Sequence, residues 1–197
     1  MFEKMTLEKY NEVLASKAPT PGGGSALAVV GSVACSLVEM SVNVTLAKIS
    51  EQDDTYQYLQ TNVGFFSRAR SRFYKLADDD AQVFQNIIDC NHLPKDTPDA
   101  QLHRQNQLQK AYHKAALVPL DVMNLCKEAL NIAKNRIYPL LYKYVASDCK
   151  IGIDLFCAII ENSMENVYAN TNLITDKTLK ETLENRGRAL ISEAKNL

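Results

Sequence analysis

The stretch from residue 26 to residue 47 carries a single formally charged side chain, Glu39. A run this long and apolar is either a membrane span or a helix enclosed by other parts of the protein. Its serines, threonine and asparagine are too polar for an isolated span, and small residues such as Gly31 and Ala34 allow neighbouring helices to pack closely. We therefore predict a central buried helix here, in a protein that does not enter the membrane.

The rest of the chain repeats apolar residues every three to four positions, and no segment alternates as a strand would. This spacing predicts an all-α fold. The length of 197 residues fits one domain, a helical bundle over residues 1–197. Glycine and proline clusters predict loops over 18–25 and 90–99, and Pro119 should kink or divide the helix that contains it. The expected helices cover 6–16, 26–47, 56–91, 100–136, 137–146, 148–171 and 176–196.

Charge and cysteine content argue against several classes of protein. The net charge is −1, so nucleic acid and anionic membranes are poorly attracted. The five cysteines are odd in number and show no two-residue gap, and the three histidines form no i, i+4 pair, so neither a disulfide framework nor a metal site is expected. The N-terminus lacks the pattern of a secretory signal, which predicts a cytoplasmic protein.

Asp80 breaks the apolar pattern of the 56–91 helix. At about 100° per residue, Phe73 and Phe84 lie within about 20° of each other, and Asp80 falls on the same stripe, about 20° from Phe73. Asp78 and Asp79 point away from this stripe. A carboxylate facing a core costs several kcal/mol unless it is paired, hydrogen-bonded or protonated. Asp80 is therefore either a structural ion pair or cap for a neighbouring helix, or a functional group.

The 148–171 helix also carries polar residues on its predicted apolar face. That face is defined by Ile151, Leu155 and Ile159. The polar residues within about 40° of its centre are Asp148, Asn162 and Asn166. Asp148 could be an N-cap, and the asparagines could join helices by hydrogen bonds. Together with Asp80 and Glu39, they favour a polar cavity inside the bundle.

Gly22, Gly23, Gly24 and Ser25 precede the buried helix. Backbone N–H groups at a helix start bind phosphate or carboxylate, although a glycine hinge with Ser25 as N-cap would give the same pattern. Lys48, at the other end of the helix, is either an anion partner or a favourable charge at a helix C-terminus. No Ser-His-Asp set and no activated cysteine can be assembled, which leaves carboxylate chemistry.

Six segments, in order, resemble the cyclodeaminase/cyclohydrolase family, which includes the cyclodeaminase domain of formiminotransferase-cyclodeaminase and stand-alone methenyltetrahydrofolate cyclohydrolases. They are Pro19-Thr20-Pro21-Gly22-Gly23-Gly24-Ser25, Asp78-Asp79-Asp80-Ala81-Gln82-Val83-Phe84, Leu93-Pro94-Lys95-Asp96-Thr97-Pro98, Val118-Pro119-Leu120, Ser147-Asp148 and Asn166-Val167-Tyr168-Ala169-Asn170. The resemblance covers essentially the whole chain. Ala47 and Asn162 stand where the family pattern has a glycine and a small residue.

The resemblance implies an all-helical homodimer that acts on one-carbon adducts of tetrahydrofolate, with no metal or other cofactor. It implies catalysis by Asp80, with Asp78 as second choice. Our hypothesis adds that Asp148, a further catalytic candidate, orients the pterin or the attacking group together with Asn166 and Asn170. The glycine segment, with Lys48 or Lys95, would bind the glutamate carboxylates of a folate that can be polyglutamylated.

Two reactions fit this resemblance. Cyclodeamination converts 5-formiminotetrahydrofolate to 5,10-methenyltetrahydrofolate and ammonia, with a separate formiminotransferase as a conceivable partner. Cyclohydrolysis converts the methenyl compound to 10-formyltetrahydrofolate. The alternative from another class is a non-catalytic folate-binding or helical scaffold module, which would explain the amphipathic helices but not the convergence of inward acids and amides.

Overall fold

The structure, a computed structural model, describes residues 2–197 and consists of helices without a strand in that range. This confirms the predicted all-α fold. The α-helices are α1 (Leu7–Leu14), α2 (Gly23–Leu46), α3 (Asp54–Asn91), α4 (Pro98–Ile132), α5 (Ala146–Thr171) and α6 (Lys177–Lys195). A short 3₁₀ turn, Phe2–Lys4, precedes α1.

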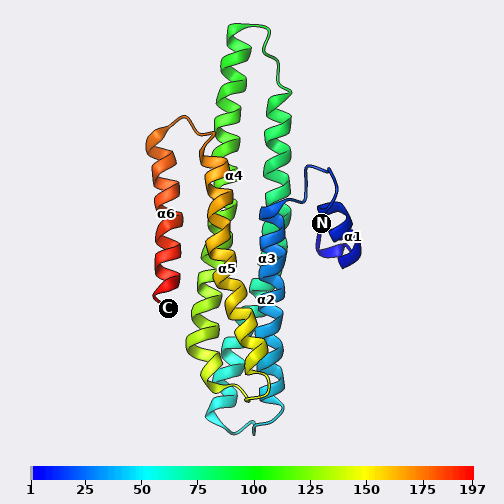
Figure 1. Cartoon of the computed structure of the whole chain (residues 1–197), viewed down its shortest axis with the longest axis vertical. Coiled ribbons are helices and arrows are strands. Elements are labelled where there is room, and N and C mark those ends of the chain that lie inside the picture. The colour runs from blue at the N-terminus through cyan, green and yellow to red at the C-terminus, as the bar shows by residue number, and fades with distance from the viewer. Residues whose placement is uncertain (1) are drawn as a thin grey trace.

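Helices α2 to α5 form an antiparallel bundle in which each helix packs against the next and α5 returns to pack against α2 (Figure 1). Helix α6 packs along α4 and α5. The core between them is filled by large apolar side chains, among them Phe66, Phe73, Leu120, Met123 and Phe156. At one end, the last turns of α3 and the first turns of α4 extend beyond α2 and α5 (Figure 1). The fold therefore leaves a step where the shorter helices stop.

Side-chain caps fix where several helices begin. Thr6, Asp53, Thr97 and Asp176 each accept a hydrogen bond from a backbone N–H in the first turn of the following helix. These residues satisfy donors that a helix start leaves without an intrahelical acceptor. Pro98 fits the first turn of α4, where its missing N–H costs nothing.

One expected helix is absent, and of the expected kink or division at Pro119 the division does not occur. The predicted 137–146 helix does not form: a π-helical turn, Ala133–Ile137, and a 3₁₀ turn, Tyr138–Leu140, end the helical run, and residues 141–145 are not helical. Pro139 has no N–H to continue the ladder. Pro119, in contrast, does not divide α4, which runs continuously past it.

Helix α2 is central, but it is not buried on every side. It contacts α3 and α5, whereas Val33 is 50% exposed and Met40 is 37% exposed on its outer face. Glu39, its only charge, forms an ion pair with Arg70 at 2.7 Å. By length and composition α2 could cross a membrane, and half of its most apolar stretch is buried within the bundle.

Candidate active site

The triglycine segment belongs to α2. Residues 18–25 were expected to form a loop, but Gly22 is the N-cap and the helix begins at Gly23. Ser25 is therefore a first-turn residue, not the N-cap. Its backbone N–H has no acceptor within the helix, because the first N–H groups of any α-helix lack one.

Asp80, on α3, supplies that acceptor. Its Oδ2 atom lies 2.9 Å from the Ser25 backbone nitrogen and 2.9 Å from Ser25 Oγ. Ser25 Oγ also lies 3.0 Å from the carbonyl oxygen of Ala77. A hydroxyl has one proton to donate, so it goes to Asp80 when that carboxylate is ionised and to Ala77 when Asp80 is protonated. The predicted alternative of a cap for a neighbouring helix is thus part of what Asp80 does.

Gly24 lets the carboxylate approach the helix. A Cβ atom on Gly24 would lie 2.2 Å from Asp80 Oδ1, well inside van der Waals contact. A Cβ atom on Gly23 would meet only Asn166 Oδ1, at an ordinary 3.7 Å. The glycine at position 24 is therefore required by close approach to an acid.

Burial raises the pKa of the Asp80 carboxyl, and the two hydrogen bonds from Ser25 lower it without cancelling that effect. Among the described residues, no lysine, arginine or histidine pairs with Asp80, so the predicted alternative of a structural ion pair is wrong. The Oδ1 atom accepts no hydrogen bond from these residues. This leaves an acid with one oxygen fixed and one available.

Asp80 lines a cavity of about 320 Å³ that lies where α2 begins and α5 ends beside α3. The other lining residues are Pro19, Thr20, Gly22, Gly23, Gly24, Val83, Phe84, Ile87, Ala115, Asn166, Ala169, Asn170 and Leu173. Asp80 is the only ionisable group among them. Phe84 was expected on the buried stripe but is 42% exposed, because α3 extends past its neighbours at this point.

Two amides face the acid from α5. The Asn170 side chain donates to the carbonyl oxygens of Asn166, at 2.9 Å, and Ala115, at 3.3 Å, which leaves its own carbonyl oxygen as an acceptor. The Asn166 side chain makes no hydrogen bond within the part of the chain that the structure describes. Both amides can thus bind a polar ligand.

Other predicted site residues lie elsewhere in the chain. Asp148 is eighteen residues before Asn166 on α5, or about 27 Å along the helix. It is not an N-cap either, since Val145 holds that position. Lys48 follows the far end of α2, about 36 Å from Gly24. Asp78 accepts the backbone N–H of Phe2 at 2.9 Å, outside the cavity lining.

Lys95 lies in the connection between α3 and α4, where it lines a different cavity. The predicted apolar face of α5 is rotated in the structure: the buried residues include Gly152, Phe156 and Ile159, whereas Ile151 is 50% exposed. Asn162 is exposed and donates to the Ala158 carbonyl oxygen. The structure therefore brings together Asp80, the α2 start and the last two asparagines of the prediction, but not Asn162.

Tyr10 was missed by the sequence reasoning. It lies on α1, is 7% exposed, and its hydroxyl has no hydrogen-bond partner in the described chain. Burial and the nearby charge of Asp80 raise the pKa of this hydroxyl. In the sequence it is one apolar member of a short amphipathic helix, so no pattern distinguishes it.

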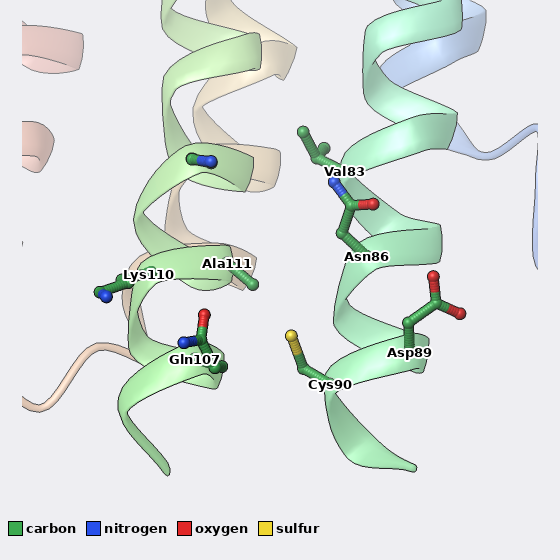
Figure 2. Close-up of a pocket in the computed structure, with 8 residues that line it drawn as sticks. Val83, Asn86, Asp89, Cys90, Gln107, Lys110 and Ala111 are labelled. Carbon is green, nitrogen blue, oxygen red and sulfur yellow. The ribbon is translucent and has the colours of Figure 1, made fainter. Parts of the chain in front are cut away.

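A second cavity, of about 270 Å³, lies between α3 and α4 and shares Val83 with the first (Figure 2). Its remaining lining residues are Asn86, Asp89, Cys90, Gln107, Lys110, Ala111 and Lys114. Figure 2 shows Cys90 of α3 facing Gln107 and Ala111 of α4. The two lysines were not predicted, because lysine on an exposed helix face is ordinary. No group of three potential metal ligands occurs in residues 2–197.

The comparisons with known proteins point in one direction. Residues 6–189 match the family model described as "Formiminotransferase-cyclodeaminase". The chain is similar to a methenyltetrahydrofolate cyclohydrolase from Methylorubrum extorquens, at 29% identity over 96% of this chain and 90% of that protein. It is also similar to the formimidoyltransferase-cyclodeaminase of Mus musculus, at 25% identity over 96% of this chain, but it spans only 35% of that longer protein.

A solved structure agrees with these relatives. The crystal structure of formiminotetrahydrofolate cyclodeaminase from Thermotoga maritima superimposes with a TM-score of 0.86 and 26% identity. The match covers 100% of this chain and 93% of that one.

Proposed function

Because the chain belongs to the formiminotransferase-cyclodeaminase family, we propose that it is a folate one-carbon enzyme whose chemistry takes place beside Asp80. The substrate is 5-formiminotetrahydrofolate, which is cyclised with loss of ammonia, or 5,10-methenyltetrahydrofolate, which is hydrolysed to the 10-formyl compound. One observation carries the proposal: the cavity holds a single ionisable group, and that group is fixed by the first turn of α2.

The two reactions ask the same thing of Asp80. In hydrolysis, a water oxygen bonds to the methenyl carbon and Asp80 takes a proton from it. The bond from that carbon to N5 then breaks, Asp80 passes that proton to N5, and the second proton of the water leaves to solvent as the formyl C=O forms. In cyclodeamination, N10 attacks the formimino carbon and loses its proton, and a proton must reach the departing ammonia. One carboxyl that accepts and returns a proton serves either reaction.

The surroundings of Asp80 suit such proton transfer. Its pKa is raised toward neutral pH, and a group that accepts and donates protons works best when its pKa is close to the pH of the reaction. The Ser25 hydroxyl can turn between Asp80 and the Ala77 carbonyl, so it can stabilise both protonation states. We assign catalysis to Asp80 alone, since Asp78 and the Asp148 of the same chain lie outside the cavity.

Binding of the pterin is proposed to rest on Asn166, Asn170 and the backbone of Gly22–Gly24, which together offer donors and acceptors beside apolar Val83 and Phe84. The glutamate carboxylates require a cation, for which Lys48 and Lys95 remain the proposed residues. No metal or cofactor beyond the folate is proposed.

We further propose a cytoplasmic homodimer. The exposed apolar side of α2 supports self-association, and five free cysteines suit a reducing compartment. If cyclodeamination is the reaction, a separate formiminotransferase would supply the substrate. Polyglutamylated folates are proposed as substrates alongside the monoglutamate.

The test is direct. Purified protein is incubated with each of the two folates, and the absorbance of the methenyl compound is followed. Growth from the formimino substrate means cyclodeamination, and decay of the methenyl compound above its spontaneous rate means hydrolysis. Asp80→Asn keeps the shape of the side chain but removes the proton acceptor, so it should abolish either change. If wild-type protein changes neither folate, it is a non-catalytic module.

A further inference from the structure

The cavity around Asp80 contains no positive charge. Its lining has one ionisable group, and that group is an acid. A folate carries at least two carboxylates on its glutamate. If the proposed function holds, a cation for them must come from outside this lining.

The side of the bundle formed by α2 and α5, which both contribute residues to the cavity lining, is apolar. Helices α2 and α5 lie side by side there (Figure 1). The exposed or half-buried residues on this surface, here called the α2/α5 face, are Ala26, Val29, Val33, Leu37, Met40 and Val44 of α2 with Ile151, Leu155 and Ala158 of α5. Gly23 and Ala169, both exposed, continue the face into the cavity. A contiguous apolar surface of this kind marks an interface.

Contacts between the two helices give their register. Ser41 Oγ lies 3.2 Å from the carbonyl oxygen of Val145, and a Cβ atom on Gly23 would lie 3.7 Å from Asn166 Oδ1. In an antiparallel helix pair, the numbers of two residues at the same height have a constant sum. That sum is 186 for Ser41 with Val145 and 189 for Gly23 with Asn166, so Val33 lies at the height of about residue 155. Val33 is thus beside Leu155, in the middle of the α2/α5 face.

The polar ends of this face are self-complementary. Asp148 and Asn162 lie seven residues on either side of Leu155. If a second copy packs against the face in antiparallel orientation, with a two-fold axis at the level of Val33 and Leu155, its Asp148 meets this chain's Asn162. A carboxylate then faces an amide donor. With the axis parallel to the helices, α5 of each copy would instead face α2 of the other, and Asp148, level with about residue 40, would lie against the partner's Met40 and lose its hydration without gaining a hydrogen-bond donor.

We propose that two copies of the chain pack antiparallel through the α2/α5 face, and that Lys48 of the partner subunit completes each site by binding a carboxylate of the folate. Gly23 is ten residues, about 15 Å, from Val33 on one side, and Lys48 is fifteen residues, about 22 Å, on the other. The partner's Lys48 therefore lies about 7 Å beyond the start of α2, at the end of the bundle where Gly22–Gly24 line the cavity.

Other features fit this placement. Lys48 is exposed and makes no ion pair within the part of the chain that the structure describes. Within one chain it lies about 36 Å from the turn that holds Asp80, so it cannot contact the folate in the site of its own chain. The inference rests on the proposed function for the role of Lys48, but the antiparallel register can be tested without any activity.

The role of Lys48 is tested with heterodimers made by co-expressing two differently tagged chains. A trans heterodimer pairs an Asp80→Asn chain with a Lys48→Ala chain. It keeps one site with both residues and should have about half of wild-type kcat/KM, although each parent homodimer has less than about a tenth. The matched cis heterodimer pairs a doubly substituted chain with a wild-type chain, has no complete site, and should stay below about a tenth.

Reversal of that order, with an active cis and an inactive trans heterodimer, would show that Lys48 serves its own chain and would overturn the proposal. So would near-normal activity of the Lys48→Ala homodimer, with the loss appearing instead in a Lys110→Ala, Lys114→Ala variant. In that case the carboxylates bind in the neighbouring cavity of the same chain.

Cysteine cross-linking tests the register, in a background where exposed Cys157 is replaced by serine. Val33→Cys should form a disulfide-linked dimer on oxidation because it lies at the axis. Ala26 and Met40 lie seven residues on either side of Val33, so position 26 of one copy faces position 40 of the other. The Ala26→Cys and Met40→Cys variants should therefore form no disulfide-linked dimer separately, but should form one when the two are mixed. Self-coupling of Ala26→Cys, or a wild-type protein that is monomeric by sedimentation, contradicts the arrangement. If wild-type protein turns over neither folate but this pattern appears, the proposed function fails and the dimer stands.

Discussion

Replacing Gly24 by alanine adds a single methyl group that should displace the Asp80 carboxylate and lower activity. The new Cβ atom would lie 2.2 Å from Asp80 Oδ1 and 2.7 Å from its carboxyl carbon, so the carboxylate must move by more than 1 Å to reach an ordinary contact distance. That movement breaks both hydrogen bonds from Ser25, which are now at 2.9 Å.

The size of the effect follows from these contacts. Each hydrogen bond to a charged group is worth about 1.5–3 kcal/mol, whereas exchanging glycine for alanine in a helix gains up to about 1 kcal/mol. We therefore expect a net loss of about 2–5 kcal/mol in the free energy of unfolding. Since misplacing a catalytic group by about 1 Å can cost about 100-fold, kcat/KM should fall by about that factor.

Gly64 offers a matched control. It also lies inside a helix, but a Cβ atom there would meet only the flexible end of Arg68, at 3.4 Å. Gly64→Ala should be stabilised by up to about 1 kcal/mol and keep wild-type activity. Urea unfolding and the methenyl assay measure both quantities. If Gly24→Ala matches Gly64→Ala in stability and turnover, the close approach of Asp80 to α2 is not what positions the acid.

Three further predictions concern Asp80 and two neighbouring side chains. Ser25→Ala removes a bond that lowers the pKa of Asp80, so that pKa should rise further and the acid limb of the pH–activity profile should shift to higher pH; an unshifted limb would assign it to another group. Burial raises the pKa of Asp80 in the folded protein above the ordinary value of 3.8. The free energy of unfolding of the wild type, relative to that of Asp80→Asn, should therefore be greatest below pH 3.8 and should decline as the pH rises through the pKa of the folded protein. Urea titrations of both proteins between about pH 4 and about pH 7 measure the difference, and a constant difference would refute it. Tyr10→Phe removes a buried hydroxyl without a partner and should leave the protein as stable or more stable by about 1 kcal/mol; a loss above about 1 kcal/mol would mean that the hydroxyl is bonded in solution.

Helical phase was enough to select Asp80 from three consecutive aspartates, because the apolar stripe of α3 is long and its period is regular. The same reasoning failed on α5. Ile151 is apolar yet 50% exposed, and Leu155 is only half-buried, whereas small Gly152 and Phe156 are buried. A stripe of hydrophobic residues does not reveal whether it faces the protein's own core or another surface.

The length of each helix relative to its neighbours was also beyond the sequence. Phe84 has the phase of a core residue, but α3 continues past the end of α2, so the ring lines an open cavity instead. Asp148 and Asn166 share a predicted face of one helix, but the eighteen residues between them place them about 27 Å apart, a separation that helical phase alone does not register. Helical periodicity predicts the side of the helix on which a side chain lies. Only tertiary packing determines which part of the neighbouring helices, if any, lies beside it.

The hydrogen bond between the Ser25 amide and Asp80 links residues 55 positions apart in the chain. Its donor is a peptide N–H that has no acceptor within α2, so the protection of this proton from exchange with heavy water depends on the bond to the carboxylate and on the burial of Ser25. A single resonance in an NMR spectrum thus monitors whether the acid is in place, in the resting protein and without any folate present.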